Sequence, residues 1–272
     1  MIACDRDALD LASPEQIRAK VREVAPDVIL NAGAYTAVDR AESEPELARA
    51  INAEAPRVLA EEALRTNALL VHYSTDYVFD GSKSGPWVED DATGPLNVYG
   101  ASKLAGEDAI RNVGGRYLIF RTSWVYGPHG KNFLFTMLRL GRERDSLNVV
   151  DDQIGAPTSS IELARATSTI TSGILAGRID KAGWPGVYNM TCSGAVSWCG
   201  FAQAIFERAP QLLGGKTPKV NAIPFSAFPT PAKRPQNSIL SNEKLFQRFG
   251  IRLAPWEAAL DEVLGKIPSP LA

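Results

Sequence analysis

The sequence has few of the residues that build metal sites and disulfide frameworks. Its 272 residues include two histidines, His72 and His129, and three cysteines scattered among apolar neighbours. A zinc site and a disulfide framework are therefore both disfavoured, and we expect Cys4, Cys192 and Cys199 to be buried, reduced thiols. The formal net charge of −2 comes without a block of basic residues, so nothing in the charge pattern indicates binding to nucleic acid or to an anionic membrane.

Long apolar runs are also missing. No stretch approaches the roughly 20 residues of a membrane-spanning helix, and the N-terminus lacks the layout of a signal peptide. A hydrophobic content of 45% and a charged content of 22% are ordinary for a globular protein. The length allows one large domain, or a large and a small one, and we expect a cytoplasmic protein.

Apolar runs and amphipathic segments alternate over the first 150 residues. The predicted strands are the tail of one ending at Asp5, then 27–31, 69–73, 117–120 and 147–150. Two predicted helices begin at Ser13-Pro14 and at Asn97. Two more cover residues 45–65, with a step at Pro56, and residues 133–143. Such alternation predicts an α/β fold with a Rossmann-like, doubly wound parallel sheet and helices on both faces.

Beyond Asp151 the order of elements changes. Predicted helices at 161–175, 198–208, 243–249 and 255–264 and strands at 186–190 and 219–223 surround a proline-rich loop at 224–235. We expect residues 1–150 to form an NAD(P)-binding Rossmann-like domain and residues 151–272 to form mainly a smaller substrate-binding portion. The two are partly interleaved, because helix 161–175 can still pack on the main sheet.

The chain is organised around the stretch from Leu69 to Glu107. After the apolar strand 69–73 comes Ser74-Thr75-Asp76, at the strand end where an open α/β sheet presents groups to a ligand. Tyr99 and Lys103 follow four residues apart, which places them on one helix face. A nearby cation lowers the pKa of a phenol, so Tyr99 is predicted to protonate a carbonyl oxygen while hydride arrives at carbon.

The Tyr-x-x-x-Lys spacing by itself is a weak signal. A half-exposed tyrosine on an amphipathic helix beside a solvated lysine gives the same pattern. The preceding Ser-Thr-Asp favours a reactive site, because Thr75 lies 24 residues before Tyr99, a natural interval for one strand-loop-helix unit.

Five motifs occur in order along nearly the whole chain: VHYSTDYVFDG, PLNVYGASKLAGE, RTSWVYG, VVDDQIGAPT and PTPAKRPQNSIL. In these motifs the sequence resembles the dTDP-4-dehydrorhamnose reductases of the extended short-chain dehydrogenase/reductase superfamily. The resemblance implies an oxidoreductase that transfers hydride from NADPH or NADH to C4 of dTDP-4-dehydro-6-deoxy-L-mannose. The product would be dTDP-L-rhamnose, in the last step of its biosynthesis, for cell-surface polysaccharide.

The resemblance also assigns roles to individual residues. It implies that Tyr99 is the general acid, that Lys103 lowers its pKa and contacts the nicotinamide ribose, and that Thr75 hydrogen-bonds the substrate carbonyl. Asp76 and Trp124 match substrate-contacting positions, although a tryptophan there can also be a packing residue. Arg234, between prolines in PAKRPQN, is a candidate clamp for the nucleotide diphosphate, with a plain surface arginine as the alternative.

Further positions match the cofactor site of the family. They are Ala34, Tyr35 and Thr36 in a turn of small residues, and Asp5, Asp10 and Leu11 near the adenosine end. An acidic residue after the second strand usually binds ribose hydroxyls and disfavours a 2′-phosphate, yet the family often accepts NADPH, so the cofactor preference stays open. Asp10 can equally be a plain loop carboxylate. Gln153 and Pro157 also match, with structural or substrate-loop roles.

Two further expectations come from the family alone. Some relatives hold a magnesium ion at a subunit interface, and the resemblance implies Mg²⁺ and a homodimer, but the sequence places no metal ligands. The nucleotide base of the substrate is likewise not encoded in any motif, because uracil and thymine differ by one methyl group.

One family feature is absent from the sequence. The superfamily opens with a strand, a G-x-x-G-x-x-G turn and a helix whose N-terminus carries the pyrophosphate, and this chain has no such turn. We expect that Met1 lies at the second strand of the fold and that the natural protein starts upstream. The alternative is a truncated chain with impaired cofactor binding. Loss of a central first strand would leave a gap in the sheet, with unpaired backbone groups on the strands at both sides of it.

Two other functions are compatible with parts of the pattern. Dehydratases of the same superfamily place Glu after Thr-Asp, where this chain has Tyr77, so dehydration is disfavoured and simple reduction of a keto-sugar fits better. Another nucleotide-sugar reductase or an epimerase stays an alternative. The regulatory β subunit of methionine adenosyltransferase resembles these reductases and acts as a binding partner. Against that role, Thr75, Tyr99 and Lys103 are all present together, which a scaffold does not require.

Overall fold

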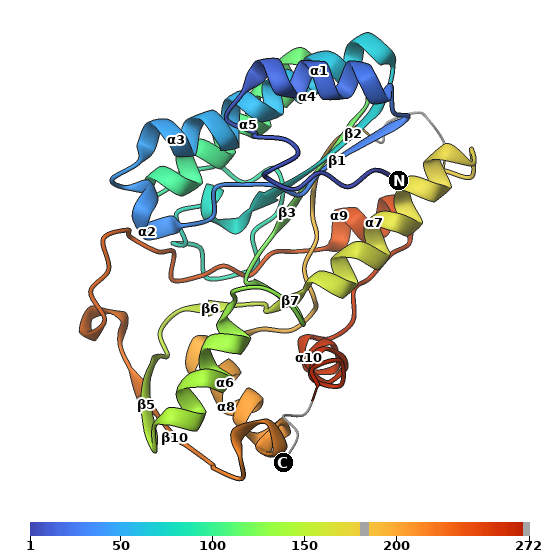
Figure 1. Cartoon of the computed structure of the whole chain (residues 1–272). Coiled ribbons are helices and arrows are strands. Elements are labelled where there is room, and N and C mark those ends of the chain that lie inside the picture. The colour runs from blue at the N-terminus through green and yellow to red at the C-terminus, as the bar shows by residue number, and fades with distance from the viewer. Residues whose placement is uncertain (180–184, 269–272) are drawn as a thin grey trace.

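The computed structural model describes residues 1–179 and 185–268, which form two lobes stacked one above the other (Figure 1). The upper lobe is built on four parallel strands in the order β1-β2-β3-β8. They are β1 (Val28–Asn31), β2 (Leu69–Thr75), β3 (Tyr117–Thr122) and β8 (Gly186–Asn189). The predicted α/β class with a parallel sheet is confirmed.

Alternating residues of the strands divide the core between the two faces of this sheet. Leu70 and Ile119 face α1 (Pro14–Val24), α4 (Ala55–Thr66) and α5 (Val98–Val113), which lie together at the top of Figure 1. Val71 and Phe120 belong to the other cluster, which includes Ile170 of α7 (Ser160–Leu175). The strands are apolar on both sides, as expected of a parallel sheet covered by helices.

Two helices begin at the predicted caps. The side chain of Ser13 accepts a hydrogen bond from Gln16 N at the start of α1, and Asn97 accepts one from Gly100 N at the start of α5. The Asn97 cap sets the first turn of the helix that carries Tyr99 and Lys103. Asparagine and serine at this position satisfy backbone N–H groups that have no partner within the helix.

The predicted helix 45–65 is divided differently from the expectation. It consists of α3 (Pro45–Arg49), a π-helical segment (Ala50–Glu54) and α4, preceded by the short α2 (Val38–Ala41). Pro56 has no N–H and its ring crowds the carbonyl four residues earlier, that of Asn52. The helix therefore widens one turn before the proline, which turns the carbonyl of Asn52 toward α5.

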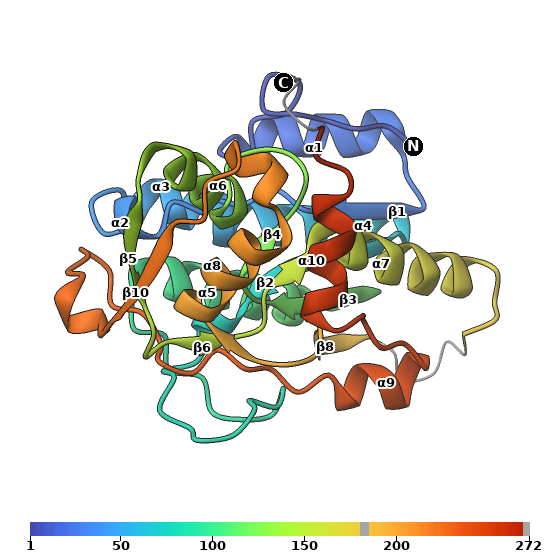
Figure 2. The ribbon, with the colours of Figure 1, turned by 90° about the horizontal axis from the view of Figure 1, so that it is seen from below.

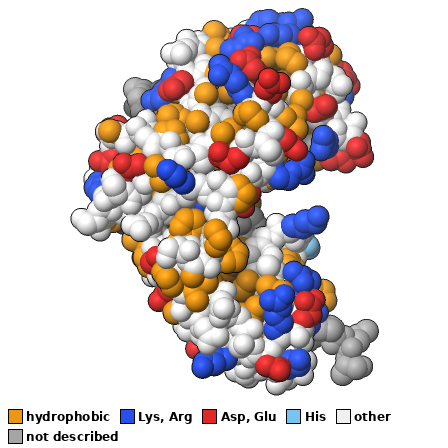
Figure 3. All heavy atoms as spheres, turned by 90° about the vertical axis from the view of Figure 1, so that its left-hand side faces the viewer, with side chains coloured by type: hydrophobic (Ala, Val, Ile, Leu, Met, Phe, Trp, Pro, Cys, Tyr) orange, Lys and Arg blue, Asp and Glu red, His pale blue; other side chains and the backbone are white. Residues whose placement is uncertain are grey.

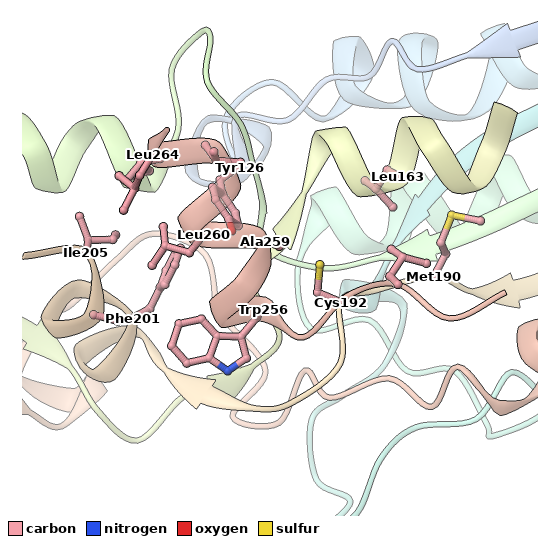
Figure 4. Packing of buried hydrophobic residues seen from close by; sticks show 14 of the residues in the cluster. Tyr126, Leu163, Met190, Cys192, Phe201, Ile205, Trp256, Ala259, Leu260 and Leu264 are labelled. Carbon is pink, nitrogen blue, oxygen red and sulfur yellow. The ribbon is translucent and has the colours of Figure 1, made fainter. Parts of the chain in front are cut away.

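The lower lobe contains most of the remaining helices. They include α6 (Phe133–Glu143), α8 (Trp198–Arg208) and α10 (Trp256–Leu264), with 3₁₀ turns at Pro210–Leu213 and Phe225–Ala227. Helix α9 (Glu243–Phe249) packs beside β8 instead, and a further 3₁₀ turn at Asp76–Val78 directly follows β2. Aromatic packing fixes the core of the lower lobe: Phe201 lies edge-to-face with both Tyr126 and Trp256, at ring-centroid distances of 5.2 and 5.9 Å (Figure 4). Leu260 of α10 completes this contact.

Three two-stranded pairings accompany these helices. β5 (Ser146–Val150) pairs with β10 (Lys219–Ile223), apart from the main sheet (Figure 2). β4 (Val125–Tyr126) pairs with β7 (Thr158–Ser159), and β6 (Ile154–Gly155) pairs with β9 (Val196–Ser197). The expectation that 147–150 completes the main series was wrong. Ser146 and Asn148 are exposed and alternate with buried residues. This pattern is typical of a strand with one solvent-exposed face.

The place next to β3 is taken by β8, which comes from the second half of the chain. The hydroxyl of Tyr73 in β2 lies 2.6 Å from Oγ1 of Thr167 in α7, so α7 also contacts the main sheet. The division into a cofactor-binding portion and a substrate-binding portion stays a prediction, and the main sheet draws on residues from both sides of Asp151.

The N-terminal residues differ from the expectation. Residues 1–13 form turns and irregular structure rather than a strand ending at Asp5, and residues 1–8 are exposed. The four strands are contiguous, with no gap between them, and β1 is the edge strand, where Leu30 is 52% exposed. Residues 1–6 do not pair with the free edge of β1, so they gain no ladder hydrogen bonds that would hold them as a strand.

Cys192 and Cys199 are buried free thiols as predicted, whereas Cys4 is exposed, contrary to the expectation, because it belongs to this irregular N-terminal segment. Within the described ranges, no helix is both long enough and apolar enough to cross a membrane.

Candidate active site

The carboxyl ends of β2 and β3 carry a group of polar side chains. Thr75 and Thr122 are register partners on these neighbouring strands, and both are buried. β2 continues two residues beyond the predicted Tyr73, so Ser74 and Thr75 belong to the strand. Parallel strands end at the same edge of the sheet, which is where open α/β sheets bind ligands.

Tyr99 lies in the first turn of α5, beside this edge. Its ring is edge-to-face with that of Tyr77, at a centroid distance of 5.5 Å. Burial raises the pKa of Tyr99 to about 12, and a hydrogen bond with the Thr75 hydroxyl acts in the opposite direction. Thr75 and Tyr99 are therefore together, as the sequence predicted, and the phenol is held in its protonated form.

The pKa of the Tyr99 phenol is raised by burial, contrary to the expectation that Lys103 lowers it. The side chain of Lys103 is 2% exposed, and Nζ donates to the carbonyl oxygen of Tyr73 at 2.6 Å. Nζ also lies 3.2 Å from Nε2 of His72. The ammonium is thus directed toward the strand, and burial lowers the pKa of Lys103 itself to about 8, partly offset by the charge of Glu107.

His72 is a site residue that sequence reasoning missed. It lies in β2 between apolar residues, with its Nδ1 3.0 Å from Nδ2 of Asn31 in β1. Burial lowers the pKa of His72 well below its usual value, with the charge of Lys103 acting in the same direction. A single histidine inside an otherwise apolar strand, adjacent to the reactive stretch, was the available signal.

Asp76 is buried directly after β2. Its Oδ1 accepts a hydrogen bond from the Thr75 hydroxyl at 3.0 Å, whereas Oδ2 makes no hydrogen bond of standard geometry within the described part of the chain. Burial raises its pKa to about 6, and the hydroxyls of Ser238 and Thr75 act in the opposite direction. Oγ1 of Thr122 and Nε2 of Gln153 are likewise buried without such a partner. These atoms can hydrogen-bond a polar ligand.

Trp124 follows β3 with a backbone φ of 48°, a left-handed conformation that is strained for a bulky residue. Its indole stacks on that of Trp198 at a centroid distance of 3.5 Å and an interplanar angle of 8°. Phe133 lies against Trp198 at 4.6 Å. A Cβ at Gly155 would come within 2.6 Å of the Trp124 ring, so only glycine fits on that side. Trp198 was not predicted as a site residue.

The predicted cofactor turn follows β1 directly. The backbone of Tyr35 is held by the side chain of Asn52, which accepts from Tyr35 N at 2.8 Å and donates to Tyr35 O at 3.0 Å. The Tyr35 hydroxyl donates to Glu44 at 2.5 Å. Ala34 and Thr36 flank this fixed residue in an irregular segment. The sequence did not identify Asn52, which is 1% exposed.

The remaining predicted cofactor residues lie before α1. Asp5 accepts a hydrogen bond from Ala8 N at 3.0 Å, and Asp10 accepts one from Ala12 N at 2.9 Å. These carboxylates serve local turns. Leu11 contacts the turn after β1, because a Cβ at Gly33 would lie 2.6 Å from its Cδ1.

Arg234 joins the two lobes. Its Nη2 donates to Oδ2 of Asp39 in α2 at 2.8 Å, and its Nη1 donates to the Thr230 hydroxyl at 2.6 Å. The side chain is 19% exposed, and the guanidinium lowers the pKa of Asp39. A hollow opens between the lobe with the parallel sheet and the lobe with α6 and α8 (Figure 3).

No group of three or more His, Cys, Asp or Glu side chains able to hold a metal ion occurs in residues 1–179 and 185–268. No residue is therefore assigned to the magnesium ion that the resemblance implied.

A family model described as the RmlD substrate binding domain matches residues 1–268 of the chain. The chain belongs to the RmlD family. The resemblance seen in the five motifs is thereby confirmed, and the RmlD model spans both lobes of the structure.

Relatives found by sequence include enzymes named dTDP-4-dehydrorhamnose reductase. The dTDP-4-dehydrorhamnose reductase of Burkholderia thailandensis is 49% identical over 258 residues, which cover 94% of this chain and 87% of the relative. The enzyme of the same name from Escherichia coli K12 is 45% identical, over 95% of this chain and 85% of the relative.

Solved RmlD structures have the same fold. The dTDP-4-dehydrorhamnose reductase from Bacillus anthracis, in complex with NADP, superimposes with a TM-score of 0.86 at 35% identity, covering 97% of this chain and 89% of that one. The orthologue from Clostridium acetobutylicum gives a TM-score of 0.88 at 38% identity, with the same two coverages.

Proposed function

We infer that this chain is a dTDP-4-dehydrorhamnose reductase that uses a nicotinamide cofactor. Its reaction would reduce the 4-keto group of dTDP-4-dehydro-6-deoxy-L-mannose and give dTDP-L-rhamnose. The observation that carries this inference is the association of Tyr99 with Thr75 at the carboxyl end of β2, with Lys103 one turn further along α5. Family membership and the names of the relatives support the same reaction.

A bound nicotinamide cofactor would supply the hydride to C4 of the sugar. We assign the binding of its ribose to Tyr99 and Lys103, and the lining of its site to the turn of Ala34, Tyr35 and Thr36. The chemistry of this set fits the group, because Lys103 is a buried cationic donor and the turn is held rigid by Asn52. Asp5, Asp10 and Leu11 remain proposals for the adenosine end.

The proton is provided by the protein. Tyr99 would give its phenolic proton to the C4 oxygen as that oxygen gains negative charge. The Thr75 hydroxyl would turn from Oδ1 of Asp76 and donate a second hydrogen bond to the same oxygen. Because the ground-state phenol is held protonated at neutral pH, the acid is ready before hydride transfer. Proton transfer of this kind contributes roughly 10²–10⁴-fold to a rate.

The sugar would be held by the buried polar atoms around the strand ends. Oδ2 of Asp76 and Oγ1 of Thr122 have no protein partner of standard geometry in the described ranges and are suited to hydroxyls of the hexose. We assign the binding of the diphosphate to Arg234 and a contact with one side of the substrate to Trp124. Tyr77 stands where a dehydratase requires glutamate, and burial raises its pKa, so it is a poor acid for eliminating water.

The reaction is tested by oxidation of NADPH, and separately of NADH, in the presence of the dTDP-4-keto-sugar, with the product identified by mass. We expect turnover that Tyr99→Phe reduces by about 10²–10⁴-fold, whereas Tyr117→Phe, at the amino end of β3 and therefore at the edge of the sheet opposite the site, leaves it unchanged.

Two results would contradict the inference. A folded chain that binds the sugar nucleotide without any turnover would favour the regulatory-subunit alternative, which a pulldown recovering a stoichiometric partner enzyme would support. Equal activity in wild type and Tyr99→Phe would remove Tyr99 from the mechanism. Homodimerisation, the magnesium ion and a cytoplasmic location stay predictions.

A further inference from the structure

A buried row of three polar side chains runs from β1 across β2 to α5. Asn31 and His72 are register partners, 5% and 1% exposed, with Nδ2 of Asn31 3.0 Å from Nδ1 of the ring. On the other side of the ring, Nε2 lies 3.2 Å from Nζ of Lys103. Both ring nitrogens therefore have a polar neighbour. The mechanism above uses Lys103 but neither Asn31 nor His72.

The hydrogen bonds that each group can donate or accept make the states of the three side chains depend on one another. A neutral imidazole donates from one nitrogen and accepts at the other. If Asn31 presents its Nδ2, then Nδ1 accepts, Nε2 carries the proton, and Nζ must accept it, which only an uncharged amine can do. If Asn31 presents its Oδ1 instead, then Nδ1 carries the proton and Nε2 accepts from the ammonium.

We propose that Asn31 and His72 are positioning residues that couple the charge of Lys103 to the tautomer of the His72 ring. In the change from ammonium to amine, an N–H bond breaks at Nζ and one forms at Nε2. The N–H bond at Nδ1 breaks, its proton passes to water, and the Asn31 amide turns over. The balance is one proton lost. Only the catalytic consequence of this coupling rests on the proposed function.

The surroundings place this change in an accessible pH range. Burial brings the pKa of Lys103 to about 8 and keeps His72 uncharged. The carboxylate of Glu107, on α5, raises the pKa of Lys103 but is itself paired with the guanidinium of Arg121 on β3. Asn31 on β1 is uncharged. Further ionisable groups at this end of the sheet include Asp76, Tyr77 and Tyr99.

The tautomer can be observed directly, because the chain has two histidines. His129 is exposed, and His129→Gln leaves the ring of His72 alone in a long-range ¹H–¹⁵N spectrum of protein with ¹⁵N-labelled histidine. In this background we expect the proton on Nδ1 at about pH 6 and on Nε2 at about pH 10, with Lys103 charged and uncharged respectively.

Two variants test whether Lys103 drives the change. Lys103→Met should make the His72 tautomer independent of pH, whereas Lys219→Met, an exposed lysine on β10, should leave the change intact. A single tautomer across the whole range in the His129→Gln protein, or a change that persists in Lys103→Met, would overturn the proposal. Neither result depends on enzyme activity, so the proposed function can fail while this inference stands.

A kinetic experiment addresses the catalytic consequence. In Asn31→Asp the carboxylate accepts only from Nδ1–H, which holds Nε2 as an acceptor and favours the ammonium form of Lys103. The high-pH limb of the kcat/KM profile should then move up by about one pH unit. A purely structural role of Asn31 would lower the rate without moving the limb, and that outcome would contradict a catalytic consequence.

Discussion

Arg121 and Glu107 form a buried, two-pronged ion pair that joins β3 to α5. Nε of Arg121 lies 2.9 Å from Oε1 of Glu107, and Nη2 lies 2.7 Å from Oε2. The side chains are 2% and 0% exposed. Oε1 also accepts from the Ser74 hydroxyl at 2.5 Å. The helix that carries Tyr99 is therefore anchored to both strands whose ends form the site.

Removing one partner of this pair should destabilise the protein strongly. We expect Arg121→Met to lower the free energy of unfolding by about 3–5 kcal/mol, because it leaves the Glu107 charge buried and uncompensated. The double variant Arg121→Met/Glu107→Leu should lose less than the sum of the two single changes. Urea unfolding of the four proteins measures this, and strict additivity would show that the pair is not energetically coupled.

Asp76 should make the stability of the ligand-free protein fall as pH rises. Its pKa is raised to about 6 in the folded state, so the protonated carboxyl stabilises the fold below the ordinary pKa near 4 and this contribution is lost on passing pH 6. The loss amounts to about 3 kcal/mol. Asp76→Asn should remove this slope, whereas Asp90→Asn, at a side chain that is 94% exposed, should retain it. Identical slopes in wild type and Asp76→Asn would refute the assignment.

The stacked indoles of Trp124 and Trp198 should be visible in solution. Closely stacked indoles couple their electronic transitions, so we expect an exciton couplet in far-ultraviolet circular dichroism that Trp198→Ala abolishes. The variant should raise KM for the sugar nucleotide by about 2- to 12-fold, corresponding to the ~0.5–1.5 kcal/mol of an aromatic pair. Phe228→Ala, at a residue that is 53% exposed, is the control. A normal KM in Trp198→Ala would remove Trp198 from the substrate site.

Arg234 should affect substrate affinity rather than chemistry. Arg234→Met is expected to raise KM for the dTDP-sugar by roughly 10- to 100-fold with little change in kcat. The reason is that the variant loses charged hydrogen bonds to the substrate, which are worth about 1.5–3 kcal/mol. Asp39→Asn should raise KM less, because it only releases the guanidinium from its partner. Arg139→Met, at a side chain that is 61% exposed, should leave KM unchanged. If Arg234→Met and Arg139→Met behave alike, the diphosphate is bound elsewhere.

Local patterns were sufficient for much of the fold. The caps Ser13 and Asn97, the strand 69–73 and the helix with Tyr99 and Lys103 all follow from residue type and spacing, and the structure agrees. Pairing was harder. The segments 147–150 and 186–190 have similar lengths, and only the tertiary arrangement decides that β8 joins the main sheet while β5 pairs with β10.

The proximity of Thr75 and Tyr99 followed from the sequence, whereas the electrostatics of the site did not. The spacing of Tyr99 and Lys103 suggested that the cation acts on the phenol, whereas burial dominates the pKa of both groups. The reason is the neighbours of Lys103: His72 and the carbonyl of Tyr73 lie on another element, and no spacing along the chain reveals them. Trp198 was missed for the same reason, since it is 74 residues from Trp124 in sequence.

Helix α5 touches two other backbones so closely that two of its positions have no room for a side chain. A Cβ at Gly100 would lie 2.2 Å from the carbonyl oxygen of Tyr77, and one at Gly106 would lie 2.1 Å from that of Asn52. In a randomised library selected for activity, codons 100 and 106 should return glycine alone. An engineer seeking to alter the chemistry would therefore leave the placement of this helix untouched and vary the loops that face it.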